Sequence, residues 1–200
     1  MRWIWIDRFE LFEPGRRAVA IKNVSMAEDY LHDHFPGFPV MPASLLIEGM
    51  AQTSGILVGA AREFREKVIL AKIGRAGFSR LVRPGEQIVY DATIERVNEM
   101  GASISGKIRA RAGDTGGQPV ELAVGEVDLM FSHIDRNMGG MKFPDFNFVF
   151  NSQFMSLFET YRRQNQLQPV QPGAAGNQRR QKIPTHRQNQ KGNRQRQTDP

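Results

Sequence analysis

The sequence has no cysteine among its 200 residues, which excludes disulfide bonds and thiol nucleophiles and disfavours zinc fingers. Long apolar runs are also missing, because Glu48 and Gln52 interrupt the most apolar segment, so no membrane span is predicted. The first ten residues contain acids and no small-residue cleavage site, which argues against a secretory signal. Together these absences favour a cytoplasmic protein.

Net positive charge is absent from most of the chain and is confined to its end. Residues 161–200 carry nine Lys or Arg and one acid, whereas residues 1–160 carry 18 basic and 20 acidic residues. A body of near-neutral charge is not typical of a nucleic-acid-binding fold, so nucleic acid is not expected as a partner. The end of the chain is rich in Gln, Asn, Arg, Pro and Gly, and residues 164–200 are predicted to be a disordered basic tail.

Hydrophobic periodicity predicts one long helix among strands. Residues 42–61 form an apolar helix with a proline in its first turn, where proline is tolerated. Because apolar residues lie on nearly every side of this helix, we expect it to be buried. Strands are predicted on both sides of it, each bounded by turn residues, over 3–12, 16–24, 67–79, 86–98, 102–112 and 119–133. The pattern predicts an α+β fold in which an antiparallel sheet wraps around the central helix.

A second helix is predicted near the C-terminus. Its aromatic and apolar residues recur at helical spacing, at Phe150, Phe154, Leu157, Phe158 and Tyr161. We expect an amphipathic helix over residues 146–163 that docks on the body or on a partner subunit. The predicted organisation is therefore a domain over residues 1–145, this helix, and the tail.

Glu48 and Gln52 lie one turn apart on the apolar helix. A carboxylate at such a position is costly to bury unless it is protonated, paired or directed at a cavity. One interpretation is a structural glutamate that is hydrogen-bonded to Gln52, and the other is a proton donor in an active site. The residues alone leave both interpretations open.

His34 precedes a Phe-Pro-Gly turn shortly before the helix. Histidine titrates near neutral pH, so His34 is a candidate general base, the alternative being an ordinary loop histidine. The free N–H groups at the start of the helix, around Ala43, are candidate donors to an oxygen that gains negative charge. His32 and His34 are spaced like a metal-binding pair, but no third ligand cluster accompanies them, so no metal is predicted. His133, at a predicted strand end, is expected at the surface.

Two segments carry a resemblance to a known family. HFPGFPVMPASLLIEGMAQ, residues 34–52, resembles the signature of the bacterial 3-hydroxyacyl-acyl-carrier-protein dehydratases, which have the hotdog fold. KIGRAGFSRLVRPGEQIVYDATI, residues 72–94, is similar to a strand–turn–strand region of the same family. The resemblance covers roughly residues 5–134. It implies a hydro-lyase without a cofactor that converts (3R)-hydroxyacyl thioesters to trans-2-enoyl thioesters in fatty-acid synthesis.

The resemblance also implies a role for each matching residue. His34 would remove the α-proton, and Glu48 would protonate the leaving hydroxyl. The backbone N–H of Ala43, where the family usually has glycine, would bind the thioester oxygen, and Gln52 would orient Glu48. In the family, the histidine and the acid of one site come from different subunits, so a homodimer or a trimer of dimers is expected.

An acyl tunnel between helix and sheet is implied as well, and its expected lining residues are Phe38, Leu45, Ile56 and Phe78. The substrate would be a thioester of acyl carrier protein or of coenzyme A. Because the carrier protein is acidic, basic residues are expected at the tunnel mouth, namely Arg75, Arg80 and Arg83. Two alternatives stay open, a hotdog acyl thioesterase and a non-catalytic acyl-binding subunit. Assays of hydration and of thioester hydrolysis would separate them.

Overall fold

Six antiparallel strands form a single sheet, in which the strand order differs from the chain order. The computed structural model describes residues 4–112, 120–134 and 143–164, all within one compact unit. The sheet has the order β1-β2-β4-β5-β6-β3, so that β3 and β1 are its edges. In chain order, the strands are β1 Arg8–Glu13, β2 Arg17–Asn23, β3 Val68–Phe78, β4 Gln87–Val97, β5 Gly101–Ala112 and β6 Val120–His133. The six expected strands are thus confirmed, but the first begins at Arg8 and not near residue 3, whereas the other strand ends differ by at most one residue.

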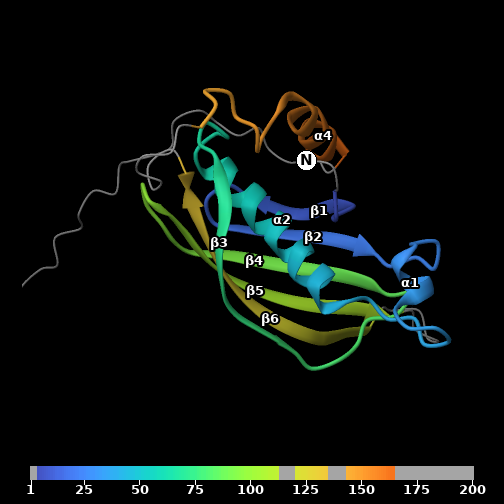
Figure 1. Ribbon diagram of the computed structural model, residues 1–200. Coiled ribbons are helices and arrows are strands. Elements are labelled where there is room, and N and C mark those ends of the chain that lie inside the picture. The colour runs from blue at the N-terminus through green and yellow to red at the C-terminus, as the bar shows by residue number, and fades with distance from the viewer. Residues whose placement is uncertain (1–3, 113–119, 135–142, 165–200) are drawn as a thin grey trace, which may run out of the picture. The chain divides into compact units, whose positions relative to one another are not determined.

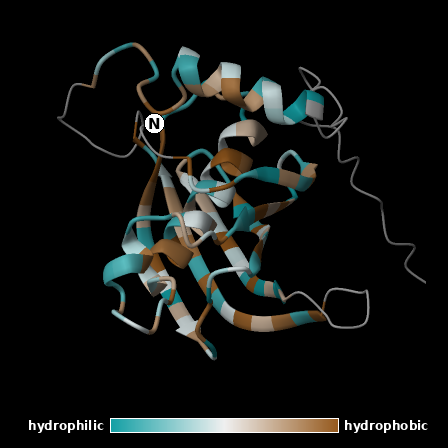
Figure 2. Cartoon of the chain, turned by 90° about the vertical axis from the view of Figure 1, so that its right-hand side faces the viewer, coloured by the Kyte–Doolittle hydropathy of each residue, from teal (hydrophilic) through white to brown (hydrophobic). Residues whose placement is uncertain are grey.

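The long helix α2, Ala43–Ala61, lies along one face of the sheet (Figure 1). Along the strands, hydrophobic and hydrophilic residues alternate, as Figure 2 shows, so that one face of the sheet can pack on the helix. Helix α2 and strand β4 approach closely at Gly49, where a Cβ atom would lie 2.2 Å from the ring of Tyr90 on β4. Burial raises the pKa of the Tyr90 phenol well above its ordinary value, so this side of the helix faces an uncharged group. The α+β hotdog architecture expected from the sequence is confirmed.

The expectation that α2 is buried on all sides is wrong for the single chain. Ala43, Ser44 and Glu48 are exposed, and Ile47 and Ala51 are only half-buried. The reason is geometric, because a six-stranded sheet covers the face of the helix that it touches and leaves the opposite stripe open. Glu48 therefore does not carry the desolvation cost that a fully apolar environment would impose.

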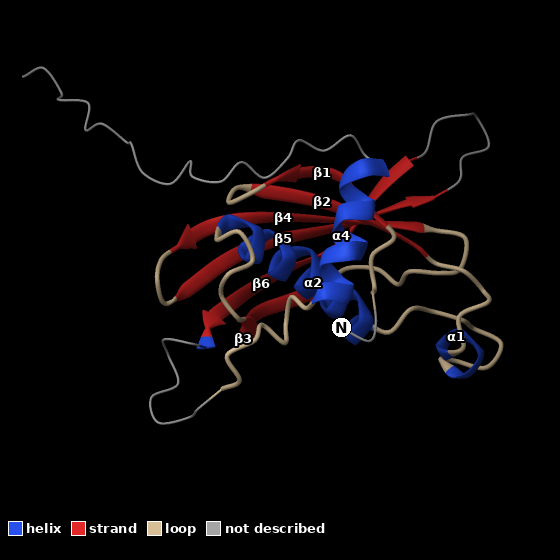
Figure 3. Ribbon diagram, turned by 90° about the horizontal axis from the view of Figure 1, so that it is seen from above, coloured by secondary structure: helices blue, strands red, loops and turns tan. Residues whose placement is uncertain are grey.

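A second helix, α4 Ser152–Gln164, packs on the body. Figure 3 separates the strands, which form one layer, from the helices α1 Tyr30–Asp33, α2 and α4. The ring of Phe158 lies 5.3 Å from that of Phe12, and the Tyr161 hydroxyl donates to the Ile6 carbonyl at 2.9 Å. Of the predicted helical segment 146–163, residues 152–163 are in α4. The predicted tail lies outside the described residues from residue 165 onward.

One smaller expectation is also corrected. His133 is fully buried at the end of β6, and its Nδ1 lies 2.7 Å from an Oε2 atom of Glu66. Glu66 comes from the loop between α2 and β3, so the burial of His133 depends on a partner that is distant in sequence.

Candidate active site

His34 is held by hydrogen bonds to Val40 at the other end of the same loop. The Val40 N–H donates to the His34 carbonyl at 2.9 Å, and His34 Nδ1 lies 2.9 Å from the Val40 carbonyl. A carbonyl oxygen only accepts, so Nδ1 must carry the proton in this contact. In the neutral imidazole, Nε2 then carries the lone pair. The ring is half-buried and stacks on Phe35, with 4.2 Å between centroids. This tautomer suits a general base that acts through Nε2.

Glu48 is held by a chain of two hydrogen bonds. The backbone N–H of Trp5 donates to Gln52 Oε1 at 2.7 Å, and Gln52 Nε2 donates to Glu48 Oε1 at 2.7 Å. The Trp5 N–H can only donate, so it fixes which end of the Gln52 amide faces Glu48. With Oε1 accepting from Gln52, the proton of a neutral Glu48 belongs on Oε2. The arrangement thus presents one oxygen of the carboxyl group for proton transfer.

A pocket of about 180 Å³ lies beside Glu48. Its walls come from α2, from the edge strand β3, from β6, and from the segment that precedes α4. Apart from Glu48 and Gln52, the lining is apolar, consisting of Ala51, Gly55, Ile56, Val68, Leu70, Phe131, Val149 and Phe150. A mostly apolar pocket with a carboxyl group in its wall can hold an apolar ligand beside a group that transfers a proton.

The start of α2 offers backbone donors. Ala43 is the first residue of the helix and is exposed, and Pro42 caps it with φ −58° and ψ 138°. The first N–H groups of a helix have no carbonyl partner within the helix. A helical residue has negative φ, so alanine at this position keeps the same donor that glycine would supply.

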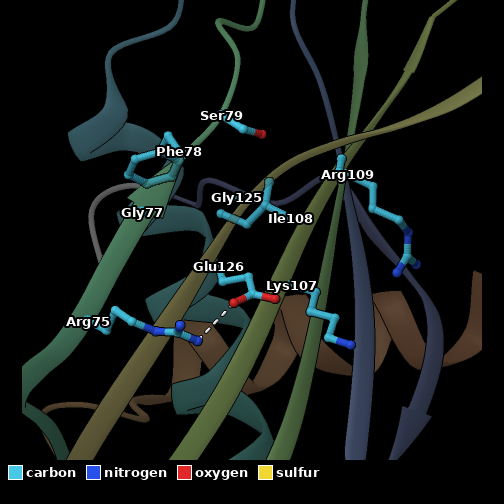
Figure 4. Close-up of a pocket in the computed structure, with 10 residues that line it drawn as sticks. Arg75, Gly77, Phe78, Ser79, Lys107, Ile108, Arg109, Gly125 and Glu126 are labelled. Atoms are coloured by element: carbon cyan, nitrogen blue, oxygen red, sulfur yellow. Dashed lines mark hydrogen bonds and ion pairs between the residues drawn. The ribbon is translucent and has the colours of Figure 1, made fainter.

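The expected tunnel residues are dispersed. Ile56 lines the pocket beside Glu48, whereas Phe38 is exposed and lies under Arg83, whose Cζ is 4.5 Å from the ring centroid. Leu45 is half-buried on α2 and does not line this pocket. Phe78 lines a separate pocket of about 560 Å³ over β3, β5 and β6 (Figure 4). The structure therefore brings only Ile56 of these four residues into the pocket beside Glu48.

The three arginines expected at the tunnel mouth also differ in their surroundings. Arg75 points toward Glu126 and donates to it at 2.8 Å, as Figure 4 shows. Arg80 is half-buried and pairs with Glu86 at 2.6 Å, and the backbone N–H of Arg83 donates to the same carboxylate at 2.7 Å. Arg83 is exposed beside the His34 loop through its contact with Phe38. Arg80 and Arg83 are thus neighbours through Glu86.

Sequence reasoning missed several residues of this site. Trp5 contributes only its backbone N–H, so its side-chain type gave no signal. Val149 and Phe150 line the pocket from a segment that the sequence predicted only to dock. Phe150 did stand out through its helical spacing with other aromatics, which indicated burial but not a role in a pocket.

Comparison with known proteins gives consistent matches. A family model described as a FabA-like domain matches residues 4–116. A 3-hydroxyacyl-acyl-carrier-protein dehydratase FabZ of Pelotomaculum thermopropionicum is 41% identical over 131 residues, covering 65% of this chain and 87% of that protein. The FabZ of Caldanaerobacter subterraneus subsp. tengcongensis is 38% identical over 96 residues, covering 48% of this chain and 68% of that protein.

Among solved structures, a hexameric hotdog-fold thioesterase of Campylobacter jejuni is similar to the chain. The TM-score is 0.48 and the identity 16%, with coverage of 76% of this chain and 96% of that one. Within the described residues, no helix combines the length and the apolar character that crossing a membrane requires.

Proposed function

The chain belongs to the FabA-like family, with FabZ dehydratases among its relatives, and on this basis we propose that it dehydrates (3R)-hydroxyacyl thioesters to trans-2-enoyl thioesters. The substrate is carried on acyl carrier protein, as the names of the relatives state for those proteins. One observation carries the proposal for the site. The base and the acid of the reaction are each held by a hydrogen bond that leaves one defined atom for proton transfer.

His34 is the general base. Its Nε2 takes a proton from the α-carbon of the substrate, and the electron pair of that C–H bond moves toward the thioester carbonyl. Negative charge that develops on the carbonyl oxygen is stabilised by the N–H of Ala43, at the positive end of α2. Backbone donors of this kind are already oriented before the substrate binds, so they cost no reorganisation during the reaction.

Glu48 is the general acid. Its Oε2 gives a proton to the β-hydroxyl, the bond between the β-carbon and oxygen breaks, and water leaves as the α,β double bond forms. The substrate has then lost one proton to His34 and gained one from Glu48. Transfer of a proton from His34 back to Glu48, through water, restores both groups.

A homodimer completes each site, with His34 from one protomer and Glu48 from the other. Strand β3 supports this arrangement, because it is an edge strand of 11 residues that is exposed along most of its length, including Leu70 and Ile73. The exposed stripe of α2 adjoins it at the pocket, which both Glu48 and Leu70 line. A second copy placed on this surface would pair the open edge and cover the stripe in one isologous contact.

Two variants test the assignment. We expect His34→Ala and Glu48→Gln each to abolish hydration of a crotonyl thioester on acyl carrier protein. Hydration is measured as the loss of the enoyl absorbance. Circular dichroism and gel filtration should give the same fold and the same assembly as for the unchanged protein. Release of free thiol is measured in the same reactions. Undiminished hydration in either variant would refute the proposal. It would also be refuted if the unchanged protein mainly hydrolysed the thioester.

A further inference from the structure

The pocket beside Glu48 is closed in part by a segment that lies outside the family match. Val149 and Phe150 line the pocket, whereas the family model matches residues 4–116. These two residues immediately precede α4. A segment near the C-terminus of the chain thus supplies one wall of the pocket.

Phe150 lies directly against the backbone of α2. A Cβ atom on Gly59 would lie 2.4 Å from Cζ of Phe150, so only glycine allows this contact. The ring is 6% exposed and meets the rings of Phe64 and Phe154 at centroid distances of 5.0 and 5.2 Å. Gly55 lines the pocket, but the ring of Phe150 occupies the space over Gly59 one turn later. The ring therefore marks where the pocket ends along α2.

Asn147 fixes the position of this ring through four hydrogen bonds. Its Nδ2 donates to the carbonyls of Phe64 and Glu66 at 3.1 and 3.2 Å. Its Oδ1 accepts from the N–H groups of Val149 and Phe150 at 3.0 and 2.9 Å. Both ends of the amide are used, and they tie the segment before α4 to the loop after α2. A wall that is held on both sides can set a fixed limit to the length of a ligand.

We infer that Phe150 is a specificity-determining residue that limits the length of the acyl chain, an inference that rests on the proposed function. Glu48 and Gly55 are seven residues apart on α2, which corresponds to about 10 Å along the helix axis. An extended chain advances roughly 1.2 Å per bond, by analogy with the polypeptide backbone. About eight bonds beyond the β-carbon therefore reach the level of Gly55, after which the chain meets the ring of Phe150.

The test compares Phe150→Leu with Phe154→Leu. Both residues are buried in the same aromatic cluster, but Phe154 does not line the pocket, so its variant controls for lost packing. The kcat/KM of the full-length protein is measured with 3-hydroxyacyl thioesters on acyl carrier protein in steps of two carbons. For the shortest acyl chains that the unchanged protein rejects, we expect Phe150→Leu to raise kcat/KM. The expected rise is about fourfold for each additional methylene that enters the pocket, which corresponds to the free energy of transferring a methylene out of water. Phe154→Leu should leave the length at which activity falls unchanged.

Two other outcomes would overturn the inference. The first is an unchanged length profile in Phe150→Leu while short substrates are still turned over. The second is an equal shift of the length profile in Phe154→Leu, which would show that weaker packing of the aromatic cluster causes the effect. If the unchanged protein converts no chain length at all, the proposed function itself fails. Val149→Ala is the second variant, because Val149 is half-buried and its truncation widens the same wall with less risk to folding.

Discussion

Replacement of Gln52 would separate the positioning of Glu48 from the stability of the fold. Gln52 accepts from the Trp5 N–H and donates to Glu48, both at 2.7 Å. Gln52→Leu removes both hydrogen bonds. Gln52→Glu keeps an acceptor for the Trp5 N–H but replaces the donor toward Glu48 with a second carboxylate. The two variants therefore differ in what they do to the N-terminal segment, while both release Glu48.

The expected magnitudes follow from these contacts. A half-buried N–H that loses its acceptor costs about 1–3 kcal/mol, so Gln52→Leu should lower the melting temperature by several degrees. Each kcal/mol corresponds to roughly 2–4 °C for a chain of this size. Displacement of a catalytic group by about 1 Å costs on the order of a hundredfold in rate. Both variants should therefore lose about that factor in kcat, and Gln52→Glu should keep more of the thermal stability.

The assay combines steady-state hydration of a crotonyl thioester with thermal unfolding of the same samples. Thr53→Ser is a matched control on the next residue of α2, because its hydroxyl can still donate to the Gly49 carbonyl. If either Gln52 variant kept an unchanged kcat, the hydrogen bond to Glu48 would not position the acid, and the role given to Gln52 would be wrong.

Three further predictions concern stability and the end of the chain. Burial raises the pKa of Asp91, but hydrogen bonds from Arg17 and Arg109 outweigh it and hold that pKa below its ordinary value. The ion pairs therefore stabilise the fold at pH values above the pKa that Asp91 has in the unfolded chain, and this stabilisation is lost as the pH falls through the lower pKa of the folded protein. Below about pH 4, the melting temperature of Asp91→Asn should therefore decrease less on acidification than that of the unchanged protein. Gly59→Ala should destabilise the fold, because overpacking costs about 1–3 kcal/mol and exceeds the gain in helix propensity of about 1 kcal/mol; higher stability in urea unfolding would contradict this. Deletion of residues 165–200 should leave kcat unchanged, since the proposed site lies before them, and a large loss of kcat would place part of the site in the deleted segment.

Local patterns predicted the elements of this fold well. Helix α2 begins after Pro42 because proline is compatible with a helix start, and the strands end where Gly, Pro and Asn favour turns. These signals are short-range, so they can be read directly from the sequence. The motif around His34 and Glu48 was equally visible, since both residues lie within one continuous segment.

Contacts between distant parts of the chain could not be predicted in the same way. The hydrogen bond from Trp5 to Gln52 joins residues 47 positions apart and involves a backbone group. The exposure of Glu48 depends on how much of α2 one sheet covers, which periodicity does not specify. The place of Phe150 in the pocket requires a glycine on another element to admit its ring.

The open edge at β3 also affects the chain before it assembles with a second copy. A newly synthesised copy exposes a row of unsatisfied amide and carbonyl groups on β3, with Leu70 and Ile73 beside them. Such an edge is a template for any extended segment nearby, and a charged lysine on the strand, Lys72, opposes indiscriminate pairing. Arg75 on the same strand is already paired with Glu126 and Asp128. Until a second copy covers this edge, the charge of Lys72 opposes aggregation there, so its neutralisation should reduce soluble yield before it affects catalysis.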